Sequence, residues 1–245
     1  MKLGADEPLA IEVTAVIQRG AVDELRRLLA AHAELATCRI VATQGSERSL
    51  LHIATDWPGH FPQVAEVIAV LVEAGAEVDA PLFGIHAETA LHWAASADDV
   101  PAIEALLAAG ASLDALGAVI GGGTPLDDAI AFGQWNAARR LVQRGARTLL
   151  WNAAALGLLD RVEAAFAREP YPTPPEVTNA FWSACHGGQR RAAEYLLDRG
   201  ADIDWIGYEG LTALDAALRQ GADDLVAWLR DDRGASTGAQ LHESK

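Results

Sequence analysis

The chain has 245 residues and a formal net charge of −15 at pH 7, and 51% of its residues are hydrophobic against 22% charged. This composition is normal for a folded chain and excludes a disordered one. The acidic balance argues against nucleic-acid binding, which needs a positively charged surface. No apolar run approaches the roughly 18 residues that span a membrane, and no secretory signal is apparent, so we expect a cytoplasmic protein without a membrane segment.

The basic residues are also biased. Only Lys2 and Lys245 are lysines, whereas the other seventeen basic residues are arginines, and alanine is abundant. This bias is typical of bacterial proteins encoded by GC-rich genomes and bears on origin alone.

In chain order, the sequence predicts a series of short paired helices. Residues 11–33 predict the first pair, with Gly20 at the turn and leucines spaced to face a core. A motif then marks each later pair, and its clearest copy reads Glu-Thr-Ala-Leu-His-Trp-Ala-Ala over 88–95. Threonine at the motif start suits a helix N-cap, and the glycine of a later Gly-Ala pair suits a helix end.

The motif resembles the Thr-Pro-Leu-His-x-Ala-Ala signature of ankyrin repeats, and Gly-Ala-Ser-Leu-Asp over 110–114 resembles their closing Gly-Ala-Asp-Val-Asn/Asp. The resemblance covers roughly residues 8–231 and implies an all-α ankyrin-repeat solenoid of helix-turn-helix units with finger loops. Seven units are expected, with starts near residues 11, 49, 89, 124, 148, 179 and 212. We expect a single domain over 1–232 and a polar, disordered tail over 233–245.

Two departures from the ankyrin pattern lie in the connecting segments. Ser49 precedes Gly75 by 26 residues, whereas Thr89 precedes Gly110 by only 21, so the second unit has an insertion around 56–62. Its aromatic side chains, Trp57 and Phe61, either pack back on the repeat or form a wall that faces a ligand. The finger loops over 80–86, 115–123 and 205–210 are apolar where such fingers are usually polar, and exposed apolar surface often marks an interaction site.

Two further connections are unusual. Thr124 precedes Thr148 by 24 residues, which leaves almost no room for a finger between the fourth and fifth units. Residues 169–176 then read as a stiff, proline-rich connector.

The resemblance also suggests roles for individual side chains. His52 and His92 occupy the histidine position of the motif, where the family uses this side chain to hydrogen-bond the backbone of the neighbouring loop. Trp93 follows at a position that faces the fingers and usually holds a smaller aliphatic residue. Cys38 and Cys185 lie in different units and are not expected to form a disulfide.

The candidate binding residues are aromatic or apolar side chains on the inner face, with a few polar groups among them: Trp57, Phe83, Ile85, His86, Trp93, Asp128, Phe132, Asn152, His186, Trp205 and Tyr208. We expect the finger over 82–86 and the insertion over 57–61 to enclose a hydrophobic chamber. Such a surface suits either a small-molecule pocket or a protein-docking groove with aromatic anchors.

Two functions remain open at this point. The resemblance implies a binding scaffold whose concave face and apolar fingers hold a partner protein. The alternative is a protein that binds a small apolar molecule, or an enzyme for cyclisation, isomerisation or dehydration of a metabolite. In that case Asp128, whose pKa apolar neighbours would raise, is the candidate acid or base, with His86 and His186 as further candidates. Phosphate-loop, His-Glu-x-x-His and Cys-x-x-Cys motifs are absent from the sequence, so no cofactor or metal is expected.

Overall fold

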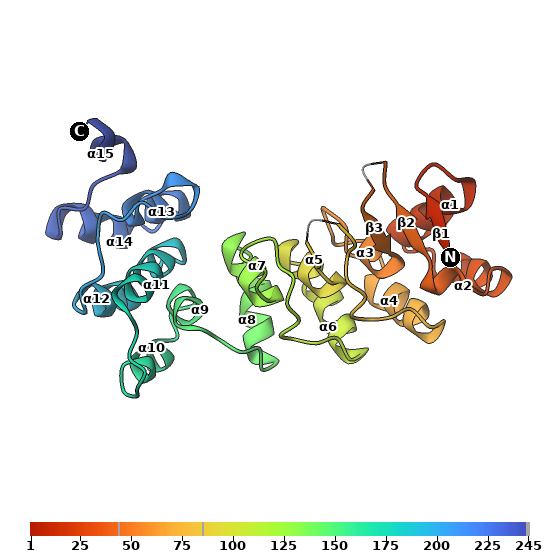
Figure 1. The fold of residues 1–245 in the computed structure, drawn as a ribbon, viewed down its shortest axis with the longest axis horizontal. Coiled ribbons are helices and arrows are strands. Elements are labelled where there is room, and N and C mark those ends of the chain that lie inside the picture. The colour runs from red at the N-terminus through yellow and green to blue at the C-terminus, as the bar shows by residue number, and fades with distance from the viewer. Residues whose placement is uncertain (44, 85, 244–245) are drawn as a thin grey trace. The chain divides into compact units, whose positions relative to one another are not determined.

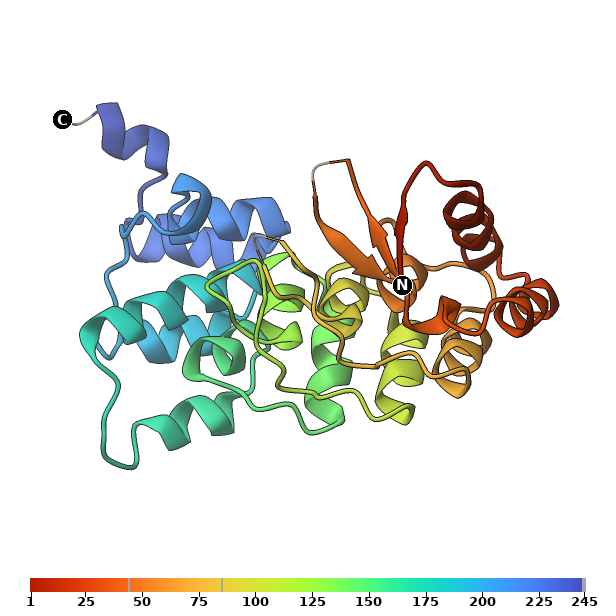
Figure 2. The same cartoon turned by 45° about the vertical axis from the view of Figure 1, so that its right-hand side comes forward.

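The computed structural model describes residues 1–43, 45–84 and 86–243, and its fold is drawn in Figures 1 and 2. The residue contacts divide the chain into two compact units, Met1–Arg147 and Thr148–Lys245, called unit 1 and unit 2 below. The boundary falls in the connection where the sequence leaves almost no room for a finger. The prediction of one continuous domain stays a prediction.

The described part of unit 1 contains four helix pairs, which follow one another along the chain in Figure 1. In order, the helices are α1 (Pro8–Gln18) and α2 (Val22–Ala31), α3 (Leu50–Ala54) and α4 (Val64–Glu73), α5 (Ala90–Ser96) and α6 (Val100–Ala108), and α7 (Pro125–Ala131) and α8 (Trp135–Gln143). First helices contact first helices of the neighbouring pairs, and second helices contact second helices. This arrangement confirms the predicted solenoid, in which each unit buries its apolar face against its neighbours.

The described part of unit 2 contains three more pairs, so the seven predicted helix pairs are all present. They are α9 (Leu150–Ala155) and α10 (Leu159–Ala165), α11 (Pro174–His186) and α12 (Arg190–Leu197), and α13 (Ala213–Gln220) and α14 (Asp223–Ala227). Alanines at the paired motif positions, such as Ala216 and Ala217, are fully buried, which lets the first helices approach closely. A core of these alanines with Phe181, Leu196 and Leu214 holds unit 2 together.

A small three-stranded sheet at the start of unit 1 is not expected from the sequence, which predicts an all-α fold. Strand β1 (Lys2–Gly4) pairs in parallel with β2 (Arg39–Val41), which pairs antiparallel with β3 (Glu47–Ser49). Three-residue strands are too short to show an alternating pattern, so only their long-range pairing reveals them.

The capping interactions explain why most first helices begin where the motif predicts. In α3 the Nδ1 atom of His52 accepts from the backbone N–H of Ser49, and its Nε2 donates to the Glu88 carbonyl oxygen at 3.0 Å. His92 repeats this pattern on Thr89 and the carbonyl oxygen of Gly123. The predicted bonding of these histidines to neighbouring loops is thus confirmed. Asp127 and Asp215 cap α7 and α13 in the same position with carboxylate oxygens.

One sequence assignment near the end of an element was wrong. The proline-rich connector reaches only Thr173, because Pro174 begins α11 and Thr173 and Glu176 form a capping box there. The disorder expected for the tail over 233–245 stays a prediction. The backbone N–H of Gly238 donates to the Asp215 carboxylate at 2.8 Å, and the short helix α15 (Gly238–Glu243) follows.

The remaining described elements are 3-10 turns, η1 (Leu35–Thr37) and η2 (Tyr208–Gly210), and a π-helical turn, η3 (Trp228–Asp232). None of the helices seen in the structure combines the length and the apolar character that crossing a bilayer requires.

Candidate functional site

Unit 1 contains a cavity of about 210 Å³ where α3, α5 and α7 meet the finger loop over 115–123. Three aromatic side chains predicted from the sequence converge on it, although they come from three different repeats. We call it the acidic aromatic pocket and define it by six of its lining residues: Trp57, Glu88, Trp93, Ser96, Val119 and Phe132.

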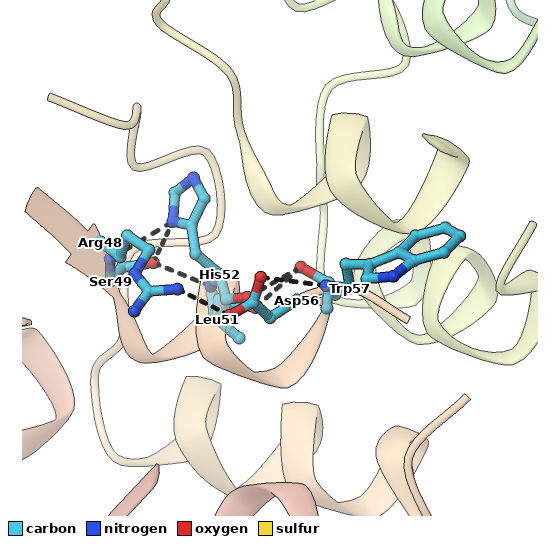
Figure 3. A network of polar contacts seen from close by, with 7 residues as sticks. Arg48, Ser49, Leu51, His52, Asp56 and Trp57 are labelled. Carbon is cyan, nitrogen blue, oxygen red and sulfur yellow. Dashed lines mark hydrogen bonds and ion pairs between the residues drawn. The ribbon is translucent and has the colours of Figure 1, made fainter. Parts of the chain in front are cut away.

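Trp57 is held at the edge of this pocket by a polar network, shown in Figure 3. Arg48 donates to one oxygen of the Asp56 carboxylate at 2.6 Å, and the other oxygen accepts from the backbone N–H of Trp57 at 3.0 Å. The indole extends away from these groups and is 76% exposed. Because Trp57 lies next to Trp93 and Phe132 at the same cavity, its exposed ring belongs to an apolar patch of the kind that often marks an interaction site.

The insertion that carries Trp57 is anchored to the next repeat. His60 donates its backbone N–H to the Asp99 carboxylate at 2.6 Å, and its Nε2 bonds the carbonyl oxygen of Ala97 at 2.9 Å. Gly59 has a positive φ of 75°, and a Cβ there would lie 2.8 Å from the Ala97 side chain. The insertion is therefore tied down at its far end and holds Trp57 beside α5.

Trp93 and Glu88 form the middle of the pocket, and His52 supports both. The His52 and Trp93 rings meet edge to face with centroids 5.0 Å apart, while the same histidine holds the Glu88 backbone. Burial raises the pKa of the Glu88 carboxyl, and the Trp93 indole N–H and the charge of His86 act in the opposite direction. Burial also lowers the pKa of His52 to about 4, so this histidine is neutral near pH 7.

Asp128 lies behind the pocket wall. It is fully buried on α7, one helical turn before Phe132, and among the described residues no donor reaches hydrogen-bonding geometry on either of its carboxylate oxygens. Burial raises the pKa of Asp128 to about 7, and the negative charge of Glu88 adds to the effect, whereas the nearby backbone N–H groups of Ile120 and Val119 oppose it. A buried carboxyl without a well-placed partner is costly, so its presence calls for an explanation.

Phe83 was expected in the hydrophobic chamber but does not line the pocket. Its backbone instead bridges Glu47 at the edge of β3, and its ring lies under the Arg39 guanidinium, 4.7 Å away. The finger is thus drawn toward the unexpected sheet, which the sequence pattern did not show. Ile85 falls outside the described residues. His86 stays close enough to Glu88 for its charge to lower the pKa of that carboxyl.

The other predicted site residues belong to unit 2 and have partners there. Asn152 is buried and caps α9 by accepting from the Leu149 backbone N–H at 2.7 Å. Tyr208 meets Trp182 and Trp205 edge to face, with centroids 5.1 and 6.2 Å apart. His186 is buried and stacks on Trp182 at 5.4 Å. We call Trp182, His186, Trp205 and Tyr208 the aromatic cluster of unit 2.

Sequence reasoning missed four polar residues that line the pocket, Thr55, Asp56, Glu88 and Ser96. Glu88 lies just before the Thr89 cap, and a carboxylate between an apolar finger and a helix start was the available signal. Ser96 sits at the end of α5, and among the described residues its buried hydroxyl has no hydrogen-bond partner. Nothing in the spacing of Ser96 distinguishes it from an ordinary helix-end serine.

Neither cysteine offers reactive chemistry. Cys38 and Cys185 are both buried and free, and burial raises the pKa of each thiol. Thiolates are the reactive form, so both side chains behave as small apolar groups. Within the described residues, histidine, cysteine, aspartate and glutamate side chains form no group of three placed to hold a metal ion.

Comparison with known proteins agrees with this architecture. A family model of three ankyrin repeats matches residues 149–240, and a single ankyrin-repeat model matches residues 87–118. The chain belongs to the ankyrin-repeat family. Among solved structures, the crystal structure of the human ASB11 ankyrin repeat domain is similar, with a TM-score of 0.52 and 19% identity over 91% of this chain and 97% of that one. No curated protein sequence matches the chain.

Proposed function

We propose that this protein is a binding scaffold that holds a partner protein, with the acidic aromatic pocket of unit 1 as the main anchor site. Membership of the ankyrin-repeat family supports a protein-interaction role in general. The observation that supports this particular site is the convergence of Trp57, Trp93 and Phe132 on one cavity. Aromatic side chains dominate the binding energy of many protein interfaces.

The size of the pocket favours a side chain over a free metabolite. Pockets for small molecules usually enclose about 300–1,000 Å³ and bury most of the ligand. This cavity measures about 210 Å³, and two of its aromatic walls, Trp57 and Phe132, are 76% and 49% exposed. A partner that covers these exposed rings gains apolar burial outside the cavity as well as inside it.

An acid–base enzyme is the second candidate, and Asp128 is the observation that favours it. A carboxyl whose pKa burial raises to about 7 is suited to proton transfer near neutral pH. Its full burial means that a substrate reaches it only if the surrounding chain moves. Glu88, which lines the cavity and whose pKa burial also raises, is then the group that would meet a substrate first.

Affinity capture with variants of the pocket tests the scaffold proposal. The full chain and its Trp57→Ala and Phe132→Ala variants would be used to capture partners from the native host, and the recovered partner would then be purified and titrated by calorimetry. We expect each variant to weaken binding of that partner by about 2 kcal/mol, as truncated aromatic anchors do.

The matched controls are exposed apolar side chains elsewhere. Leu116→Ala changes a 72% exposed side chain in the finger loop over 115–123, which also contributes Val119 to the pocket. Tyr171→Ala changes a 58% exposed side chain in unit 2. Both should leave affinity within about twofold, as surface contacts outside an anchor site do. A partner that is lost equally with Tyr171→Ala would place the anchor elsewhere and contradict the proposal.

A further inference from the structure

We infer that the acidic aromatic pocket receives a positively charged side chain, an arginine in a basic segment of the partner protein. The inference rests on the proposed function and specifies the chemistry of its anchor. It follows from three features of the pocket. Two carboxyls, Glu88 and Asp128, form no ion pair among the described residues, with only the charge of His86 near Glu88. Aromatic rings line the cavity, and the Ser96 hydroxyl has no hydrogen-bond partner among the described residues.

The charges around the pocket are unbalanced. Asp56 already has a cation, because Arg48 donates to it at 2.6 Å. Glu88 lines the cavity and is only 7% exposed, and Asp128 lies fully buried behind it with both oxygens lacking a hydrogen-bond donor among the described residues. Two carboxyls that are buried at or behind the cavity wall favour a cation in the cavity, since buried charges are normally paired.

The aromatic side chains favour the same ligand. Trp57, Trp93 and Phe132 present rings to one small cavity, and a cation over a ring face is attracted by its quadrupole. A guanidinium suits this site better than an ammonium, because it is planar, stacks on rings, is weakly hydrated and donates several hydrogen bonds in fixed directions. The Ser96 hydroxyl, buried and without a partner among the described residues, offers a further acceptor.

An apolar occupant explains these features less well. A leucine or phenylalanine of a partner would cover the rings, but it would shut Glu88 away from water with no donor beyond the Trp93 indole. Leaving a carboxylate unpaired at an interface costs more than the apolar contact gains. The net charge of −15 also steers a basic segment toward the protein.

A pair of peptides tests the inference before the partner is identified. The probes are acetyl-Gly-Ala-Arg-Ala-Gly-amide and the same peptide with citrulline, which has the shape of arginine but no charge. Each is titrated at 0.15 M salt into the full chain, and the indole N–H resonances are followed by NMR. Trp57→Phe and Trp93→Phe variants assign the two signals.

We expect the arginine peptide to shift both indole signals and the citrulline peptide to bind at least about tenfold more weakly, as loss of one charge-assisted contact implies. Glu88→Gln and Asp128→Asn should each weaken the arginine peptide several-fold and leave the citrulline peptide unchanged. Glu66→Gln, which removes an exposed carboxylate on α4, is the matched control and should have no effect.

Three results would overturn the inference. Equal binding of both peptides would show that charge is irrelevant, and an equal effect of Glu66→Gln would show attraction by the net charge alone. Unshifted indole signals would show that the pocket does not take arginine. Because Trp57 is 76% exposed, Trp57→Leu tests the ring contribution without risk to folding. The partner-capture experiment does not depend on the peptides. A scaffold that anchors an uncharged side chain would therefore still be recognised when the arginine inference fails.

Discussion

The pocket of unit 1 and the aromatic cluster of unit 2 use similar side chains in opposite ways. In unit 2, Trp182 stacks on His186 and donates its indole N–H to the carbonyl oxygen of Leu211 at 2.9 Å. In unit 1, Trp57 and Phe132 are exposed at the pocket, and Glu88 is the carboxyl that lines the cavity with them. A tryptophan in an apolar finger or motif is thus not evidence of a site until its neighbours are known.

The two regions differ in the segments that surround the histidine position of the motif. His52 and Trp182 occupy equivalent places, and both donate a ring N–H to the next loop. In unit 2 the next loop then brings Tyr208 onto Trp182, which closes the cluster. In unit 1 the insertion after α3 directs Trp57 outward, so the space beside Trp93 stays open.

The largest expected effect is the loss of stability when a side chain of the aromatic cluster is truncated. Trp182→Ala removes a buried indole and its hydrogen bond, so the free energy of unfolding should fall by about 3–5 kcal/mol. Urea unfolding with hydrogen exchange resolved along the chain would place the loss in unit 2. A change in the free energy of unfolding below about 1 kcal/mol would show that Trp182 does not hold the fold together, and the contrast with Trp57 would fail.

The next effect concerns Asp128 and its dependence on pH. Burial and the charges of Glu88 and Asp127 raise its pKa in the folded chain from 3.8 to about 7, so folding takes up a proton. Its stabilising contribution is therefore complete below pH 4 and is lost as pH rises toward 7, by up to about 4 kcal/mol. Asp128→Asn should match the wild type near pH 4 and exceed it in stability at pH 8, measured by urea unfolding. A difference that does not change with pH would contradict the raised pKa.

A smaller effect separates the two kinds of capping side chain. His52→Ala leaves the Glu88 carbonyl and the Ser49 cap without their partner and should cost about 1–3 kcal/mol, whereas Asp215→Ala should cost about 1 kcal/mol. Because burial lowers the pKa of His52 from 6.5 to about 4, its contribution is complete above pH 6.5 and is lost as pH falls through that range. The cost of His52→Ala, followed by thermal unfolding, should accordingly shrink toward pH 4. A constant cost would show that the histidine acts by packing alone.

The smallest effect on stability belongs to Trp57. Trp57→Ala removes a side chain that is 76% exposed and should change the free energy of unfolding by less than about 0.5 kcal/mol. Set against Trp182→Ala in the same urea experiment, this contrast tests the comparison between the two regions directly. A loss of several kcal/mol would make Trp57 a packing residue and remove it from the binding site.

The sequence by itself determined the repeat architecture. Most helix pairs are specified locally, by a capping Ser or Thr, an apolar face, small alanines and a closing glycine, so their places can be predicted from a few adjacent residues. The same locality placed Trp57, Trp93 and Phe132 among the candidate residues. The histidine position of the motif also predicted the bonding of His52 and His92 to the neighbouring loops.

Only the tertiary structure decided which candidates meet. Phe83 was drawn away by a bridge to Glu47 on strand β3, and Glu47 lies 36 residues earlier in the sequence. Glu88 is placed at the pocket by the hydrogen bond between its carbonyl oxygen and His52, which lies 36 residues earlier in the sequence. The sequence separation of such contacts follows no fixed period, so no local pattern predicts them. The pKa of Asp128 likewise depends on burial by residues from several segments. Helix periodicity is local and can be read from the sequence, whereas burial and unpaired charge are properties of the packed fold.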